Sequence, residues 1–179
     1  MMMIKKGMSV HELCYISIFA AIIAVCAFIS IPMPYGVPMT LQTFAIPLAG
    51  IVLGARNGTI ATLVYVLLGA IGAPIFAGFT GGVGIIFGRT GGFILSFPLM
   101  ALTAGIGAKK NHYWLTLWLV IGAVINFICG MLMFSFVSST SLVVSFGYVV
   151  VPFLPTAVIK VVLVVVFGKL IKQALSGYQ

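Results

Sequence analysis

Long apolar stretches, separated by only a few charged residues, dominate this 179-residue chain. Hydrophobic residues make up 63% of it and charged residues 6%, whereas about 25% of the residues of a soluble domain are charged. Such a chain cannot cover a surface that faces water, so lipid must be its solvent. A membrane-spanning helix needs about 20 mostly apolar residues, a length that several of these stretches approach or reach. The sequence therefore predicts an all-α integral membrane protein.

Six of these stretches fit membrane-spanning helices. We expect them in a single domain over residues 1–179, at about residues 13–31, 41–55, 59–75, 90–108, 113–137 and 155–171. The second is short and contains Pro47, and the turn Arg56-Asn57-Gly58 separates it from the third. A glycine-rich stretch between the third and fourth helices predicts a re-entrant or lid loop.

Lys and Arg are distributed unevenly between the predicted loops. With the N-terminus in the cytoplasm, seven of the nine fall on the cytoplasmic side, namely Lys5, Lys6, Arg56, Lys109, Lys110, Lys169 and Lys172. The predicted outer loops, at about residues 32–40, 72–88 and 138–155, contain neither Lys nor Arg. Because cytoplasmic loops carry an excess of Lys and Arg, this pattern predicts a multi-pass protein of the cell membrane with both termini in the cytoplasm.

The composition also excludes several classes of function. Glu12 is the only acidic residue, so a mechanism that needs two carboxylates is excluded. Cys14, Cys26 and Cys129 occur singly within apolar stretches, without the spacing of metal ligands. The net charge of +8 comes from short charged segments between apolar stretches and not from a basic patch. We therefore expect no enzyme, no metal, no cofactor and no nucleic-acid partner.

Arg89 and Lys160 are two cations that the topology does not explain. Arg89 lies at the outer end of the fourth predicted helix, and Lys160 lies about one turn into the sixth. A charge within the membrane costs about 2.5–3.5 kcal/mol on insertion scales, so an intramembrane Lys is a candidate functional residue. One interpretation is that Lys160 extends to the outer interface. The other is that Lys160, with Arg89, binds an anion that a ligand brings from outside, since Glu12 lies at the cytoplasmic entrance.

Two Thr-Gly-Gly motifs, Thr80-Gly81-Gly82 and Thr90-Gly91-Gly92, place further polar groups on the outer side. Glycine lets backbone N–H groups approach a ligand closely, and Thr can cap a helix or donate its hydroxyl. Alternatively, these glycines only fold a tight turn or let helices pack closely. Gln42 and Asn126 are polar residues within apolar stretches, and each could bond a neighbouring helix or face a cavity.

Small residues lie on two predicted helix faces. Ala20 and Ala24 belong to such a face of the first helix, and Gly50, Gly54 and Gly58 recur at four-residue spacing at the end of the second. Small residues four positions apart let helices approach closely. These faces predict either packing within the protein or docking onto a partner membrane subunit.

Motifs known together from one family extend in order from about Pro32 to Lys160. They are Pro38-Met-Thr-Leu-Gln-Thr43, Leu68-Gly-Ala-Ile-Gly-Ala-Pro-Ile-Phe-Ala-Gly78, Thr90-Gly-Gly92, and Pro152-Phe-Leu-Pro155 with Lys160. In these motifs the chain resembles the BioY family, the biotin-specific S components of energy-coupling factor (ECF) transporters. The resemblance implies a six-helix S-component bundle that captures biotin on its outer side and works with a transmembrane T component and two ATPases.

The resemblance also implies roles for individual residues. The Lys of the sixth helix and a polar residue of the glycine-rich loop belong to the family's biotin site, and Lys160 and Thr80 match them. The spacing of Ala20 and Ala24 matches the helix-one face that contacts the T component. We expect Lys160 to bind a carboxylate or ureido oxygen of biotin. The other candidate ligand-binding residues are Gln42, Gly81, Gly82, Arg89, Thr90 and Asn126.

Two positions depart from the family's pattern. The family typically has an Asp three residues before the Lys, where this chain has Ala157, and a Pro where it has Arg89. These changes could retune affinity, change the preferred ligand, or mark a divergent member in which Arg89 substitutes in part. The alternatives are therefore an S component for another small anionic vitamin, or a self-standing facilitator or channel. A channel would call for a polar stripe through several helices, and the chain has only Asn126, Gln42 and scattered Ser and Thr.

Overall fold

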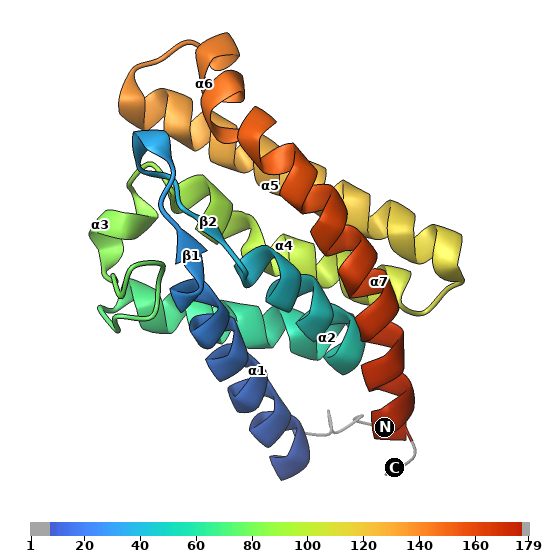
Figure 1. Ribbon diagram of the computed structural model, residues 1–179. Helices are drawn as coiled ribbons and strands as arrows, with labels where there is room; N and C mark the ends of the chain where they lie inside the picture. The colour runs from blue at the N-terminus through green and yellow to red at the C-terminus, as the bar shows by residue number, and fades with distance from the viewer. Residues whose placement is uncertain (1–7, 177–179) are drawn as a thin grey trace, which may run out of the picture.

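The computed structural model describes residues 8–176, which form a helical bundle with a short two-stranded sheet at one end (Figure 1). The helices are α1 (Val10–Phe28), α2 (Gln42–Ala70), α3 (Val83–Ile86), α4 (Gly91–Gly107), α5 (His112–Ser138), α6 (Leu142–Val149) and α7 (Leu154–Ser176). Strands β1 (Ser30–Ile31) and β2 (Met39–Thr40) pair antiparallel, and 3-10 turns occupy Pro34–Gly36 and Val151–Phe153. Lys5 and Lys6, and the side chains of Lys169 and Lys172, lie outside what the structure describes.

Within the described residues, four segments are long and apolar enough to cross a membrane. They are Val10–Phe28, Gln42–Ala70, His112–Ser138 and Leu142–Gly168. The apolar helix α4 adds a shorter one of 17 residues. Many of their large apolar side chains are exposed, as a surface in contact with lipid requires. The chain is therefore a multi-pass membrane protein, as its composition predicts.

Helix α2 is a helical hairpin, and its two halves are the second and third predicted helices. Gly54 has φ +80° and ψ 168°, which are not helical values, so the chain turns at this residue. A Cβ on Gly58 would lie 2.6 Å from the Cα of Gly50, although eight residues of straight helix span about 12 Å. Gln42 and Tyr65 likewise form a hydrogen bond across the hairpin. With α1, α4, α5 and α7, the two halves account for the six predicted helices.

The structure corrects several predicted boundaries. The turn between the second and third helices is at Gly54 and not at residues 56–58, because the positive φ there is one that glycine adopts easily. The third helix ends at Ala70 and not near residue 75. Helix α1 begins earlier than expected, because Ser9 and Glu12 form a capping box: Ser9 N donates to Glu12 Oε2 at 2.9 Å, and Glu12 N donates to Ser9 Oγ at 3.2 Å.

Helices α3 and α6 occupy segments that we expected to be loops. Helix α6 lies within the predicted outer loop 138–155 and is eight residues long, too short to be recognised as a membrane span. The Ser141 hydroxyl accepts a hydrogen bond from Val144 N at 3.4 Å and caps the helix. Helix α3 is a single turn that follows Gly82. Both helices therefore belong to the end of the bundle that carries the strand pair (Figure 1).

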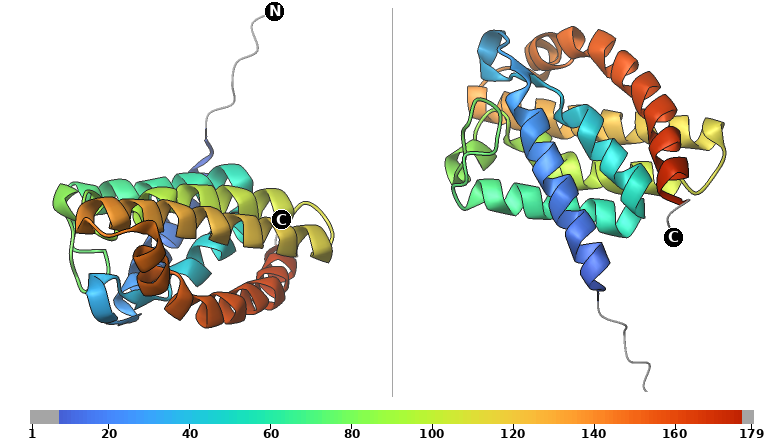
Figure 2. Two further views of the ribbon diagram at one scale, coloured as in Figure 1. Left: turned by 90° about the horizontal axis from the view of Figure 1, so that it is seen from above. Right: turned by 60° about the horizontal axis from the view of Figure 1, so that its bottom comes forward.

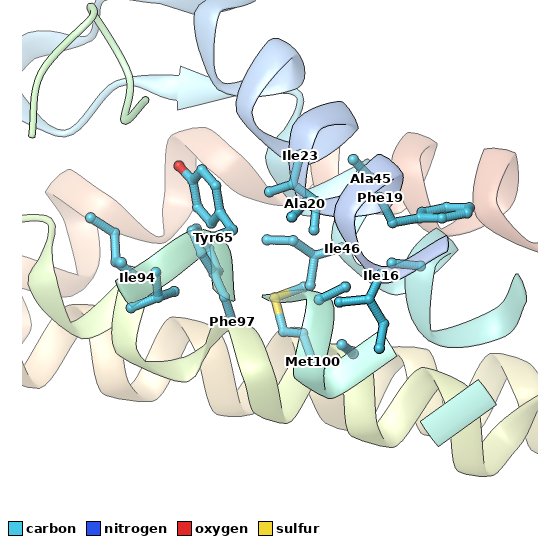
Figure 3. Close-up of a cluster of buried hydrophobic side chains, with 14 of the residues drawn as sticks. Ile16, Phe19, Ala20, Ile23, Ala45, Ile46, Tyr65, Ile94, Phe97 and Met100 are labelled. Carbon is cyan, nitrogen blue, oxygen red and sulfur yellow. The ribbon is translucent and has the colours of Figure 1, made fainter. Parts of the chain in front are cut away.

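The main hydrophobic core lies between α1, α2 and α4. Figure 3 shows Ile16, Ala20 and Ile23 of α1 gathered with Ile46 of α2 and Met100 of α4. Helices α2 and α4 share the most extensive contact in the fold. A Cβ on Gly50 would overlap the carbonyl oxygen of Ala101, so the two backbones approach too closely for a side chain there. Helices α2 and α4 also line the cavity described below, through Pro47 of α2 and Phe97 and Met100 of α4.

The two ends of the bundle carry different residues. The strand pair, α3 and α6 gather at one end, whereas the α4–α5 connection and the end of α7 lie at the other (Figures 1 and 2). Asn57, just after the turn of α2, donates from Nδ2 to Glu12 Oε1 at 3.3 Å and ties that turn to the start of α1. Arg56 and the pair Lys109–Lys110 therefore belong to the second end. This separation agrees with the cation pattern in the sequence.

Candidate functional site

A cavity of about 390 Å³ lies between α2, α4, α5 and α7, with the segment that joins β1 to β2 contributing part of its wall. Most of the wall is aliphatic or aromatic. Its phenylalanines come from several parts of the chain and are Phe76, Phe93, Phe97, Phe127 and Phe153. A small-molecule site typically has a volume of about 300–1,000 Å³ and an apolar wall with a few polar groups. The cavity has the size and character of such a site.

Most of the predicted ligand-binding residues contribute to this wall. Those that line the cavity are Gln42, Thr80, Thr90, Asn126 and Lys160. Gly81 and Gly82 do not line it. A Cβ on Gly81 would overlap the carbonyl oxygen of Ala73, and Gly82 has φ +97° where α3 begins. These two glycines therefore shape the loop, which is the second of the two interpretations that their motif allowed.

Lys160 extends from α7 across the cavity to the start of α2. Its Nζ donates to the backbone oxygen of Thr40 at 2.7 Å and to Thr43 Oγ1 at 2.8 Å. Its side chain is half-buried and lines the cavity, so it does not extend to the outer interface. Thr40 and Thr43 were missed in the sequence. Both lie close to Gln42 in the Pro38–Thr43 motif, and this position could have marked them as candidate site residues.

A chain of hydrogen bonds continues from Thr40 into the interior of the protein. Thr40 Oγ1 donates to Gln42 Oε1 at 2.9 Å, and Gln42 Nε2 donates to Tyr65 Oη. Tyr65 Oη donates in turn to the backbone oxygen of Ile75 at 3.2 Å. Tyr65 is fully buried, and its hydroxyl points away from the apolar core (Figure 3). These bonds connect both halves of α2 to the loop after it, so they position the groups around Lys160.

Asn126 joins α5 to α4 on another side of the cavity. Its Nδ2 donates to the backbone oxygen of Phe93 at 2.9 Å and to Ser96 Oγ at 2.7 Å. Asn126 is 3% exposed, so its amide cannot bond to water. The two bonds within the protein replace the hydrogen bonds to water that burial removes. Asn126 therefore bonds a neighbouring helix and also lines the cavity, which were the two alternatives for this residue.

The cavity wall carries a cation and no acidic side chain. Glu12, the only acid in the chain, bonds to Ser9 and Asn57 at the other end of the bundle. Ala157, which carries no charge, lines the cavity three residues before Lys160. Positions three apart on a helix lie on the same face. The ammonium of Lys160 therefore has only neutral hydrogen-bond acceptors among the side chains and backbone groups described around it.

Arg89 lies outside the cavity, which differs from its predicted role as a second ligand-binding cation. Its side chain is exposed, and its Nη1 donates to the backbone oxygen of Tyr35 at 3.3 Å. The Tyr35 ring stacks on Tyr148 of α6, with centroids 3.6 Å apart. The ring of Phe28 stacks on Phe79 at 4.2 Å in the neighbouring loop. The two contacts of Tyr35 hold the segment between β1 and β2 against α6 and the α3–α4 connection, and the Phe28–Phe79 stack ties the end of α1 to the loop before α3.

Ala20 and Ala24 face the interior of this structure. Ala20 is 6% exposed in the core, and Ala24 packs partly buried against the same core. The small residues of α1 that are exposed are Cys14, Ser17 and Ala21. Internal packing, one of the two predicted explanations for this face, is therefore the one realised in this conformation.

The family model described as BioY matches residues 2–177 of the sequence. The chain belongs to the BioY family. Its similarity to the "Biotin transporter BioY2" of Lactococcus lactis subsp. cremoris is 37% identity over 96% of this chain and 95% of that protein. It is 44% identical to the "Probable biotin transporter BioY" of Pyrococcus horikoshii, over 59% of this chain and 65% of that one.

A solved structure supports the BioY assignment at the level of the fold. It is the crystal structure of "the S-component for biotin from an ECF-type ABC transporter", which superposes with a TM-score of 0.83. The two sequences are 27% identical, and the match covers 93% of this chain and 95% of that one. The predicted S-component fold of this BioY family member is thus confirmed.

Proposed function

We propose that this chain is the substrate-capturing membrane subunit for biotin uptake by an ECF transporter. Its BioY relatives are named biotin transporters, and the similar solved structure is a biotin S component. The observation that carries the proposal for this chain is the apolar cavity into which Lys160 brings a positive charge. Catalysis is left to partner ATPases, so the chain itself is no enzyme.

The chemistry of biotin matches the cavity in three respects. Its bicyclic thioether ring is apolar, as most of the wall is. Its ureido head has two N–H donors and one acceptor, and amide and hydroxyl groups can bond these. Its carboxylate is an anion, and Lys160 can bind it through its positive charge. Alternatively, Lys160 can donate a hydrogen bond to the ureido oxygen. The proposed contact residues are Gln42, Thr80, Thr90, Asn126 and Lys160. Gly81 and Gly82 would shape the glycine-rich loop, and Arg89 would hold the segment that joins β1 to β2.

Transport would depend on a transmembrane T component and two ATPases. Biotin would bind from outside under the segment that joins β1 to β2, and the bundle would then reorient within the complex. Helix α1 is the proposed docking element. Docking through Ala20 and Ala24 requires α1 to move from the core, because Ala20 is buried. The exposed residues Ser17 and Ala21 offer small side chains on the same helix without that movement.

Reconstituted protein tests the proposed function directly. We expect labelled biotin to bind the purified chain saturably and in competition with unlabelled biotin but not with other small anionic vitamins. Vesicles that contain the chain alone should not accumulate biotin against a gradient, whereas vesicles with a T component and both ATPases should do so when given ATP. Displacement by another vitamin would favour an S component for that vitamin. Accumulation or rapid equilibration by the chain alone would instead indicate a facilitator.

We also propose that the end with the strand pair faces outward and that both termini are cytoplasmic. A cysteine at Gly84 tests this orientation, because this residue is exposed and a Cβ there meets no atom within 4 Å. The three native cysteines are first replaced by serine. An impermeant maleimide added outside intact cells should label Gly84→Cys but not Lys109→Cys, whose residue is exposed at the other end. The reverse labelling pattern would show the opposite orientation.

A further inference from the structure

Helix α5 carries a stripe of exposed apolar side chains along one face. Its members are at least 44% exposed and recur at spacings of three and four residues, which places them on the same side of the helix. They are Leu117, Val120, Val124, Ile128, Leu132 and Phe136. The stripe extends about 28 Å along the helix axis, at 1.5 Å per residue. The hydrocarbon core of a bilayer is about 30 Å thick, so this stripe matches it from one side to the other.

The start of α5 then lies at the level of the lipid headgroups. Trp114 is one turn before Leu117 on the same face, and Tyr113 is next to it. Both rings are exposed, Tyr113 by 86% and Trp114 by 44%. Trp and Tyr are enriched at this level of membrane proteins, because each has an apolar ring and a polar N–H or O–H group. In the orientation proposed above, these headgroups belong to the cytoplasmic leaflet, which carries anionic lipids.

Lys110 brings a positive charge to the same place. Its Nζ lies 4.6 Å from the centroid of the Trp114 ring, in an attractive cation–π arrangement. Among the described residues no acidic side chain pairs with it, because Glu12, the only acid in the chain, bonds Ser9 and Asn57. The ring covers one side of the ammonium, whose N–H groups can still donate to an acceptor outside the protein. An exposed cation is therefore held beside an indole at the depth of the headgroups.

We infer that Lys110 and Trp114 bind the phosphate group of an anionic phospholipid at the start of α5. The ammonium supplies the charge, and the indole N–H can donate to a second phosphate oxygen. A zwitterionic headgroup carries its own ammonium, which weakens its attraction to Lys110. An acidic protein surface is the rival occupant, but the apolar stripe places Trp114 within the headgroup layer and not beyond it. The bound lipid would hold α5 at a fixed depth in the membrane. None of these residues lines the biotin cavity, so this lipid site is independent of the proposed function.

Fluorescence quenching by brominated lipids tests the lipid site on the purified full chain. Trp114 and Trp118 are the two Trp residues, and the buried Nε1 of Trp118 has no hydrogen-bond partner, so a Trp118→Phe background loses no such bond. This protein is reconstituted into phosphatidylcholine vesicles that contain increasing shares of brominated phosphatidylglycerol or, separately, brominated phosphatidylcholine. Both leaflets have the same composition, so the orientation of the chain does not affect the result.

We expect the anionic lipid to bind beside Trp114 at least about fivefold more tightly than phosphatidylcholine, because one Lys near an anionic surface changes a binding constant by about this factor. Lys110→Gln should reduce the ratio to about one. Arg56→Gln is the matched control: it removes the same charge from an exposed residue at the same end of the bundle, and it should keep the ratio. Raising the salt concentration should lower the ratio in the parent protein, since salt screens exposed charges.

Equal binding of the two lipids to the parent protein would overturn the lipid site, whatever the variants do. A ratio that stayed high in Lys110→Gln would also overturn it, by removing Lys110 from the contact. If the parent showed no lipid preference, and Lys110→Gln instead prevented assembly with a T component and ATPases, the occupant would be an acidic protein surface and not a lipid. Each of these results leaves biotin binding, and with it the proposed function, unaffected.

Discussion

Replacing Lys160 by alanine should weaken biotin binding by at least about tenfold. The ammonium donates to Thr40 and Thr43 at the cavity wall and is the only cation that lines the cavity among the described side chains. A hydrogen bond to a charged group contributes about 1.5–3 kcal/mol, and 1.4 kcal/mol corresponds to a factor of ten in affinity. Calorimetry or equilibrium binding of labelled biotin to the purified variant measures the change.

Lys109→Ala is the matched control for this prediction. It removes the same charge from an exposed position at the opposite end of the bundle, so the affinity for biotin should stay as in the wild type. Thermal unfolding of both variants shows whether they remain folded. A Lys160→Ala protein that stays folded and binds biotin as tightly as the control would remove Lys160 from the site.

Gly50→Ala should destabilise the fold strongly, although it adds a single methyl group. That methyl group would overlap the carbonyl oxygen of Ala101, and a Cβ on Gly105 of α4 would likewise overlap the backbone of Ala55. Backbone atoms cannot change rotamer, so α2 and α4 would have to separate. Overpacking of this kind costs about 1–3 kcal/mol and sometimes more. The measurement is the unfolding temperature in detergent, followed by size-exclusion chromatography after heating.

Gly147→Ala, in helix α6, adds the same methyl group where it meets no atom within 4 Å. We expect this variant to be at least as stable as the wild type, since alanine favours helix over glycine by about 1 kcal/mol. If the two variants unfolded at the same temperature, close backbone contact between α2 and α4 would not be what stabilises the bundle.

The sequence predicted the membrane helices well, because a long apolar stretch in lipid must satisfy its own backbone hydrogen bonds. Helix α5 differs from its predicted range by only one residue at each end. The α2 hairpin was predicted as two helices, but its turn was placed after Gly54, at Arg56-Asn57-Gly58, because polar residues mark a turn more visibly than one glycine does. Helix α6 was missed, since its eight residues fall below the length of a span.

For the site, the sequence indicated which residues were unusual but not which of them meet. Lys160, Gln42 and Asn126 were noticeable as polar groups in apolar stretches, and all three line the cavity. Arg89 was equally noticeable, yet its side chain bonds the backbone of Tyr35 outside the cavity. Thr40 and Thr43 were inconspicuous, because their importance comes from the Lys160 side chain that reaches them from α7.

The amino-acid composition alone decided that lipid surrounds this protein, and the positions of the apolar stretches decided where its main helices lie. Both follow from local chemistry, since each stretch meets lipid with its own side chains. The contacts of Lys160 were decided by the tertiary structure, because they join residues 120 and 117 positions apart in the chain. No periodicity within one helix encodes such a pair. Only the packing of α7 beside the start of α2 brings the ammonium to the two threonines.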